Sequence, residues 1–178
     1  EGWEVHVISS ENPHQDESAW LEDVVSPNII QYFLPFNYPK EFIGIGTGSF
    51  LGRACYFLKA NYYKRIQKKR IYDGAFLWEQ QFTDKVRELI HNDGITNMIV
   101  TGAPFYLTYY ASKLKKNEFP NLNLLTDLRD PWIGAANYGI PNLSPEKKAL
   151  EISYRQTVYS YSNYITAPNS FMLEPMKE

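Results

Sequence analysis

Apolar positions along the chain alternate between the period of a strand and the period of a helix. Residues Glu4–Ser9 and Ile29–Leu34 alternate and are rich in Val and Ile, which predicts strands. Short apolar runs predict further strands at 97–101, 122–126 and 164–167. Longer stretches with helical spacing predict helices over about 50–69, 75–92, 104–116 and 145–161.

Turn and cap residues support these boundaries. Gly94 follows the second predicted helix and supplies a stop. Pro104 and Pro145 suit the first position of a helix, and Ser144 suits the cap before it. Helices that alternate with strands imply β-α-β units with parallel strands. We therefore predict an α/β fold in which residues 1–178 form one doubly wound, Rossmann-like domain with helices on both faces of a parallel sheet.

Composition narrows the class of protein. The chain has 178 residues, 44% of them hydrophobic, and a formal net charge of -2, which suits a globular domain and argues against a nucleic-acid binder. Cys55 is its one cysteine, so no internal disulfide or thiolate zinc cage can form. The scattered His6, His14 and His91 do not predict a metal site. We expect a cytoplasmic location, because a single cysteine fits a reducing compartment.

The most informative segment runs from Leu124 to Trp132. An apolar strand ends in Asp127, Arg129, Asp130, a proline and an indole. Ligands of open α/β sheets bind beyond the carboxyl ends of the strands, so the segment predicts a site. One interpretation is that a carboxylate here binds a hydroxyl group of a ligand. The alternative is that Asp127 and Arg129 pair to hold the loop while Trp132 fills the core.

At this point the sequence resembles a known family. Thr101–Phe105, the string Asp127–Trp132, Glu151 and the segment 165–169 occur in the order found in the N-terminal domain of GT-B-fold glycosyltransferases of the retaining family four. The segment Gly2–Ile8 resembles the second strand of that domain. The resemblance implies two Rossmann-like domains facing across a cleft, with the acceptor on the N-terminal one. The nucleotide-sugar binds the other, which carries an E-x7-E motif.

The sequence departs from the family pattern at both ends, where the first strand and the C-terminal domain are missing. We therefore expect the domain to be incomplete, the chain alone to be inactive and the donor-binding residues to lie outside it. The function implied is transfer of a sugar from a nucleotide-sugar to a glycan or lipid-linked acceptor, with no cofactor besides that donor. The alternative is a non-catalytic α/β module that binds a glycan or a protein partner.

Candidate site residues follow from the segment at the end of the strand and from the resemblance to the family. In many family members a histidine precedes an aspartate at the position where Arg129 stands, so Asp130 becomes the catalytic candidate. Asp127 and Arg129 are acceptor-binding candidates, together with the loop Gly102, Ala103 and Pro104, whose backbone N–H groups could hold an anion or a hydroxyl. The alternative for this loop is a tight turn between strand and helix.

Other segments have a structural and a functional interpretation each. Glu151 lies near a helix start, where the helix dipole stabilises a carboxylate. We favour this role over contact with the acceptor. Basic and aromatic residues over 59–72 predict either a solvated helix with inward tyrosines or peripheral contact with the inner face of a membrane. The glycine-rich Gly44–Gly48 has the wrong spacing for a dinucleotide site and favours a surface loop.

Overall fold

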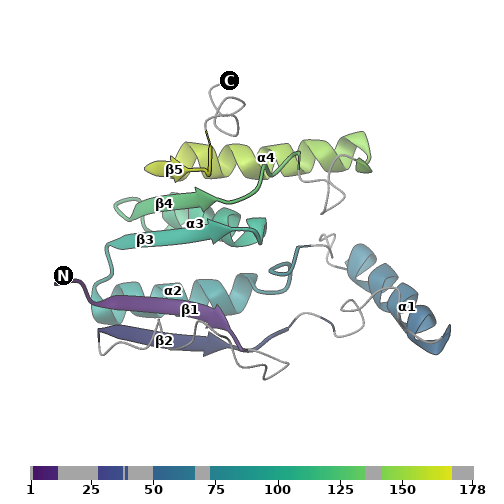
Figure 1. Ribbon diagram of the computed structural model, residues 1–178, viewed down its shortest axis with the longest axis horizontal. Helices are drawn as coiled ribbons and strands as arrows, with labels where there is room; N and C mark the ends of the chain where they lie inside the picture. Colours follow the sequence, from purple (N-terminus) through teal and green to yellow (C-terminus); the bar gives the residue numbers. More distant parts are fainter. Residues whose placement is uncertain are drawn as a thin grey trace. The chain divides into compact units, whose positions relative to one another are not determined.

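The computed structural model describes residues 2–11, 28–37, 39, 50–66, 73–134 and 142–169 (Figure 1). The chain is an α/β protein whose strands pair in parallel. It divides into two compact units, Glu1–Asn37 and Tyr38–Glu178. The elements in chain order are β1 (Val5–Ser10), β2 (Ile29–Leu34), α1 (Phe50–Ile66), α2 (Glu79–Asp93), β3 (Asn97–Gly102), α3 (Phe105–Asn117), β4 (Asn123–Leu128), α4 (Pro145–Tyr161) and β5 (Tyr164–Thr166).

The first unit holds the parallel pair β1 and β2. Their register runs from Val5 opposite Ile29 to Ser10 opposite Leu34. Both predicted strands are confirmed, with β1 displaced by one residue toward its end. The His6 ring stacks on the Tyr32 ring, and its Nδ1 lies 3.1 Å from the Tyr32 hydroxyl, so this histidine has a local structural role.

The second unit is built on a three-stranded parallel sheet with the order β3-β4-β5 (Figure 1). Helix α3 packs against β3 and β4, and α2 and α4 both pack against α3. The two consecutive β-α-β crossovers therefore place the three carboxyl strand ends along one edge of the sheet.

Alternation along the strands decides which side chains enter the core of the second unit. Val100, Leu124 and Leu128 are buried, whereas Ile99 is 73% exposed on the other side of β3. Helix α3 contributes the buried stripe that meets this face, formed by Phe105, Tyr106, Ala111 and Leu114, among others. The core thus lies between the sheet and α3.

Boundaries differ from the sequence-based ranges where a turn competes with a helix. Helix α2 begins at Glu79 and not near residue 75, because 74–77 form turns closed by the bonds from Phe76 N to Asp73 O and from Trp78 N to Ala75 O. Its end at Gly94 is confirmed: this residue has φ 66°, a conformation that glycine adopts without strain.

Two further boundaries bear on the site. Pro104 is the cap of α3 and not its first residue, because its ψ of 137° is extended. Strand β4 continues through Asp127 to Leu128, two residues beyond the predicted end.

The Gly44–Gly48 loop, His14 and the segment after Asn169 lie outside the described residues. Among the helices that the structure describes, none combines the length and the apolar content needed to cross a membrane.

Candidate functional site

The carboxyl ends of β3, β4 and β5 bring the sequence-predicted site residues to one edge of the sheet. Gly102 pairs with Leu128, and Asp127 pairs with Thr166. The backbone N–H of Arg129 donates to the carbonyl of Gly102 over 2.7 Å. The loops after β3 and β4 are therefore held together by a main-chain bond, and they form one continuous rim.

Asp127 is held in place by two donors. Its Oδ2 accepts from Nε of Arg129 at 3.0 Å, and its Oδ1 accepts from the Thr166 hydroxyl at 2.8 Å. The Thr166 hydroxyl, followed by the Arg129 guanidinium, holds the pKa of this carboxyl below its usual value. The pairing of Asp127 with Arg129 that the sequence offered as one alternative is present, and the bond from Thr166 to Asp127 ties β4 to β5.

Arg129 and Asp130 face solvent. The Arg129 side chain is 70% exposed, and its bond to Asp127 uses Nε. Asp130 is exposed, and within the part of the chain that the structure describes its carboxylate makes no hydrogen bond or ion pair. The Asp130 carboxylate and the Arg129 guanidinium are thus the charged groups of this rim that face solvent.

The loop Gly102, Ala103 and Pro104 closes tightly against the core. A Cβ added at Gly102 would lie 3.1 Å from Cγ2 of Thr108 and 3.4 Å from Cδ1 of Phe105. The close approach of this backbone to α3 therefore leaves little room for a side chain at position 102. The interpretation of this loop as a tight turn has direct support in that packing.

The start of α3 already holds an internal acid, which the sequence analysis missed. Oδ2 of Asp73 accepts the backbone N–H of Tyr106 at 3.2 Å, and Oδ1 accepts the N–H of Ala75 at 2.9 Å. The expectation of free N–H groups at this helix start is therefore wrong for Tyr106. A carboxylate suits the position because the helix dipole is positive there.

Asp73 is completely buried, and burial raises its pKa to about 7. The N–H groups of Ala75, Tyr106 and Phe105 act against that rise, whereas the nearby carboxyl of Glu151 adds to it. A titratable acid thus lies directly beneath the loop that carries Gly102 to Pro104. The only local signal for it was the pair Asp73-Gly74, which is typical of a turn.

Glu151 is also fully buried and does not lie on an exposed helix start. Its Oε1 accepts from the Tyr106 hydroxyl at 3.1 Å, and its Oε2 accepts from Nε1 of Trp132 at 2.9 Å. The structural role favoured for this residue is supported, but its cause is this pair of buried donors. Trp132 itself is 2% exposed and stacks on Phe105 with ring centroids 5.1 Å apart.

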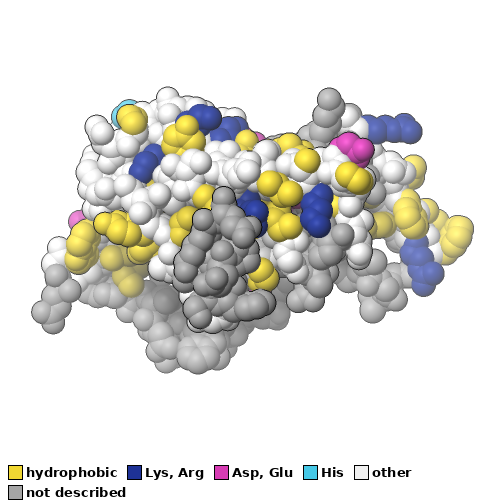
Figure 2. Space-filling view, turned by 90° about the horizontal axis from the view of Figure 1, so that it is seen from above, with side chains coloured by type: hydrophobic (Ala, Val, Ile, Leu, Met, Phe, Trp, Pro, Cys, Tyr) yellow, Lys and Arg dark blue, Asp and Glu magenta, His cyan; other side chains and the backbone are white. Residues whose placement is uncertain are grey.

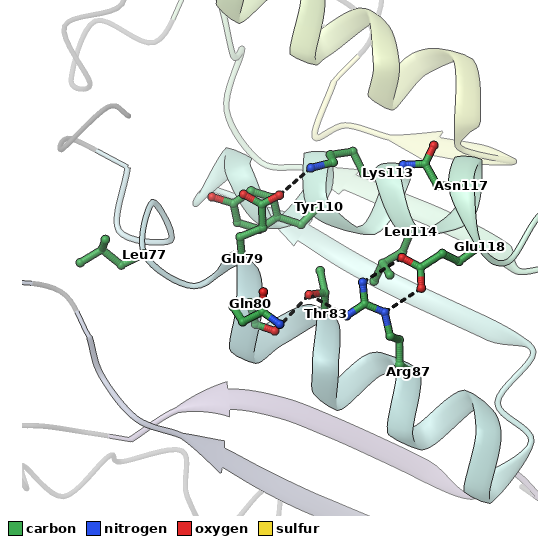
Figure 3. Close-up of a pocket in the computed structure, with 10 residues that line it drawn as sticks. All are labelled: Leu77, Glu79, Gln80, Thr83, Arg87, Tyr110, Lys113, Leu114, Asn117 and Glu118. Carbon is green, nitrogen blue, oxygen red and sulfur yellow. Dashed lines mark hydrogen bonds and ion pairs between the residues drawn. The ribbon is translucent and has the colours of Figure 1, made fainter. Parts of the chain in front are cut away.

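A separate pocket of about 440 Å³ lies between α2 and α3 (Figure 3). The Arg87 guanidinium donates twice to Glu118, at 2.7 and 2.8 Å, and Lys113 pairs with Glu79 at 2.6 Å. The charged side chains that line the pocket are therefore paired with one another. No residue of the strand-end rim lines this pocket, so the two features are distinct.

No group of three or more His, Cys, Asp or Glu side chains that could hold a metal ion occurs within the described ranges. Comparisons of the chain with protein-family models, with curated proteins and with solved structures found no match.

Proposed function

We propose that this chain is the acceptor-side domain of a retaining glycosyltransferase, with a doubly wound half of a GT-B architecture. The observation that carries the proposal is the exposed carboxylate of Asp130 at the carboxyl edge of a parallel sheet, where it has no hydrogen-bond or ion-pair partner among the described residues. Ligands of α/β sheets bind at that edge. The D-x-R-D-P-W string found there is the part of the sequence that most resembles the family.

Within this proposal the rim residues have different tasks. Asp127 holds Arg129 through the 3.0 Å bond, and Arg129 presents its terminal nitrogens to an acceptor oxygen or phosphate. The loop Gly102–Pro104 forms the neighbouring wall, fixed by the main-chain bond between Arg129 and Gly102. Rigid support of this kind places a reacting hydroxyl accurately.

Asp130 accepts the proton of the acceptor hydroxyl as the acceptor oxygen attacks the anomeric carbon on the face from which the nucleoside diphosphate leaves, so that the configuration is retained. The bond from that carbon to the nucleoside diphosphate breaks, and the diphosphate leaves with the electron pair. The resemblance assigns the donor to a second domain and implies retention of configuration. The reaction takes place in the reducing compartment that the single cysteine favours.

The test is a transfer assay on the full-length gene product with a panel of uridine, guanosine and thymidine diphosphate sugars. Once a donor and acceptor are found, Asp130→Asn should lower kcat by about 100-fold, as expected for loss of a general base. Asp93→Asn, an exposed aspartate at the end of α2, is the matched control and should retain full turnover. Turnover of Asp130→Asn within a few-fold of the wild type would contradict the catalytic role.

A non-catalytic binding module is the second candidate. It is favoured by the internal bonds that already occupy the Asp127 carboxylate. The distinguishing measurement is calorimetric titration of the chain with acceptor glycans alongside the transfer assay. Glycan binding that Asp130→Asn abolishes, in a full-length product that transfers no sugar, would establish the module and exclude the enzyme.

A further inference from the structure

Helix α1 has two apolar faces, and only one of them is packed. Tyr56, Ala60 and Tyr63 follow one another at i, i+4 and i+7, and among the side chains of α1 that the structure describes they are the ones that are half-buried or buried. Ala60 is 3% exposed, and the Tyr63 ring meets the Phe76 ring edge to face at 5.4 Å. Of the tyrosines that the hypothesis for residues 59–72 placed inward, Tyr63 is on this packed face and Tyr62 is exposed, while 67–72 lie outside the described residues.

The opposite face of α1 is apolar and exposed. Phe50, Leu51, Phe57 and Leu58 occupy two i, i+7 rows of the helix, with exposed fractions of 85%, 75%, 62% and 72%. Tyr62, 55% exposed, extends the row of Leu58 by one turn. Contiguous apolar patches of this kind on a protein surface mark interaction sites.

Charge identifies the kind of partner. The sequence from Phe42 to Tyr72 contains seven Lys and Arg and no Asp or Glu, within a chain whose formal net charge is -2. Among the described residues of α1, Arg53 is exposed beside the apolar face, and the exposed Arg65 continues the row of Leu51 and Leu58 at its C-terminal end. Figure 2 shows yellow apolar and dark-blue basic side chains next to one another where α1 lies. This surface of α1 therefore complements a partner that has an apolar interior covered by a negatively charged surface layer.

We propose that the exposed face of α1 inserts into the surface of an anionic phospholipid bilayer. The helix lies in the plane of the membrane, with the apolar side chains of the Phe50–Leu58 rows among the acyl chains and its arginines among the phosphate groups. A second copy of the chain is a poor occupant, because it would bring two strongly positive segments together. A nucleic acid would leave the apolar rows unused.

This assignment differs from the expectation for residues 59–72. The contacting apolar residues begin at Phe50, earlier in the chain than that segment, and Tyr63 belongs to the packed face. Lipid binding is measured without any sugar donor, so its result is independent of the transfer assay.

The test uses Cys55, the one cysteine of the chain, which is exposed on α1. The chain is labelled there with an environment-sensitive nitrobenzoxadiazole group and mixed with vesicles of phosphatidylcholine, with or without about one third phosphatidylglycerol. Sedimentation with the anionic vesicles and a blue shift of the label are expected, and both should weaken at about 0.5 M salt.

Two pairs of substitutions divide the apolar from the charged contribution. The double variant Phe57→Ser and Leu58→Ser should lower the partition coefficient between anionic vesicles and water about tenfold or more. Ile99 on β3 is about as exposed as these residues, and Ile99→Ser should leave that coefficient unchanged. The double variant Arg53→Glu and Arg65→Glu should also lose binding, and the same change at Lys116 and Lys147 on α3 and α4 should have little effect. Circular dichroism checks that each variant is folded.

Two results would overturn the proposal. One is binding to anionic vesicles that the α1 variants and the control variants retain equally. The other is a lipid-free dimer, detected by light scattering, that the Phe57 and Leu58 substitutions dissociate, since it would make a second copy the occupant.

Discussion

Nε1 of Trp132 donates a hydrogen bond to Oε2 of Glu151 over 2.9 Å. Both side chains are buried, and the second oxygen of Glu151 accepts from the Tyr106 hydroxyl. One carboxyl group thus connects the segment after β4, helix α3 and helix α4. Trp132 follows Asp130 by two residues, so this connection supports the rim on which Asp130 lies.

Glu151 offers the first prediction. Glu151→Ala leaves the Trp132 and Tyr106 donors buried without an acceptor and opens a cavity, so it should lower the free energy of unfolding by about 3 kcal/mol or more. Glu151→Gln should cost less than about 1 kcal/mol. Its amide oxygen can accept from the indole, and its NH2 group can donate to the hydroxyl of Tyr106.

Urea denaturation of the two variants measures these costs, and Ser153→Ala on the exposed side of α4 is a control for substitution in the helix. Equal losses in Glu151→Gln and Glu151→Ala would show that the hydrogen bonds do not stabilise this core.

Asp73 predicts a pH-dependent stability. Its pKa is raised to about 7 in the folded chain, from about 3.8 for an accessible aspartate, so the folded state binds more protons between these values. The free energy of unfolding should therefore fall as pH rises from about 4 to about 7, with a slope of up to about 1.4 kcal/mol per pH unit from this group. Above pH 7 its contribution should be constant. Urea denaturation across this range measures the slope.

Asp73→Asn supplies the control for that slope. An asparagine does not titrate, so the contribution of this position to the pH dependence should disappear. Asp84→Asn, an aspartate on the exposed side of α2, should leave the slope between pH 4 and 7 nearly unchanged. An identical slope in the wild type and in Asp73→Asn would refute the assignment.

Local pattern was sufficient for most elements of the fold. Strands and helices followed hydrophobic periodicity, and the end of α2 followed from Gly94. The pairing of Asp127 with Arg129 was open to prediction because the two residues lie two positions apart at the end of β4.

The buried acids could not be predicted in this way. Asp73 meets Tyr106, 33 positions away, and Glu151 meets Tyr106 and Trp132, 45 and 19 positions away. The sequence alone therefore shows Glu151 as one more carboxylate near a helix start. Only the packing of α4 against α3 makes it an acceptor for buried donors.

Asp127 offers a prediction about electrostatics at the rim. The Thr166 hydroxyl is the largest cause of its lowered pKa, followed by Arg129. Thr166→Val should therefore raise the pKa of Asp127 more than Arg129→Gln does, and the double variant should bring it close to the ordinary value. Carboxyl carbon NMR across a pH titration reports it directly. A larger shift in Arg129→Gln would show that the ion pair, and not the hydroxyl, determines the charge of Asp127.

Gly102 provides the sharpest test of the packing beneath the candidate site. Gly102→Ala places a methyl group 3.1 Å from Cγ2 of Thr108, so it should destabilise the fold by about 1–3 kcal/mol. Thr108→Ser deletes that Cγ2 and keeps the hydroxyl that bonds Phe105 O at 2.7 Å, so in the double variant it should restore part of the loss. Gly74→Ala, whose added carbon would meet only Cγ of Pro104 at 3.8 Å, is the matched control and should be tolerated. Thermal denaturation of the variants measures the coupling, and strict additivity of the two changes would mean that contact with Thr108 is not what requires glycine here.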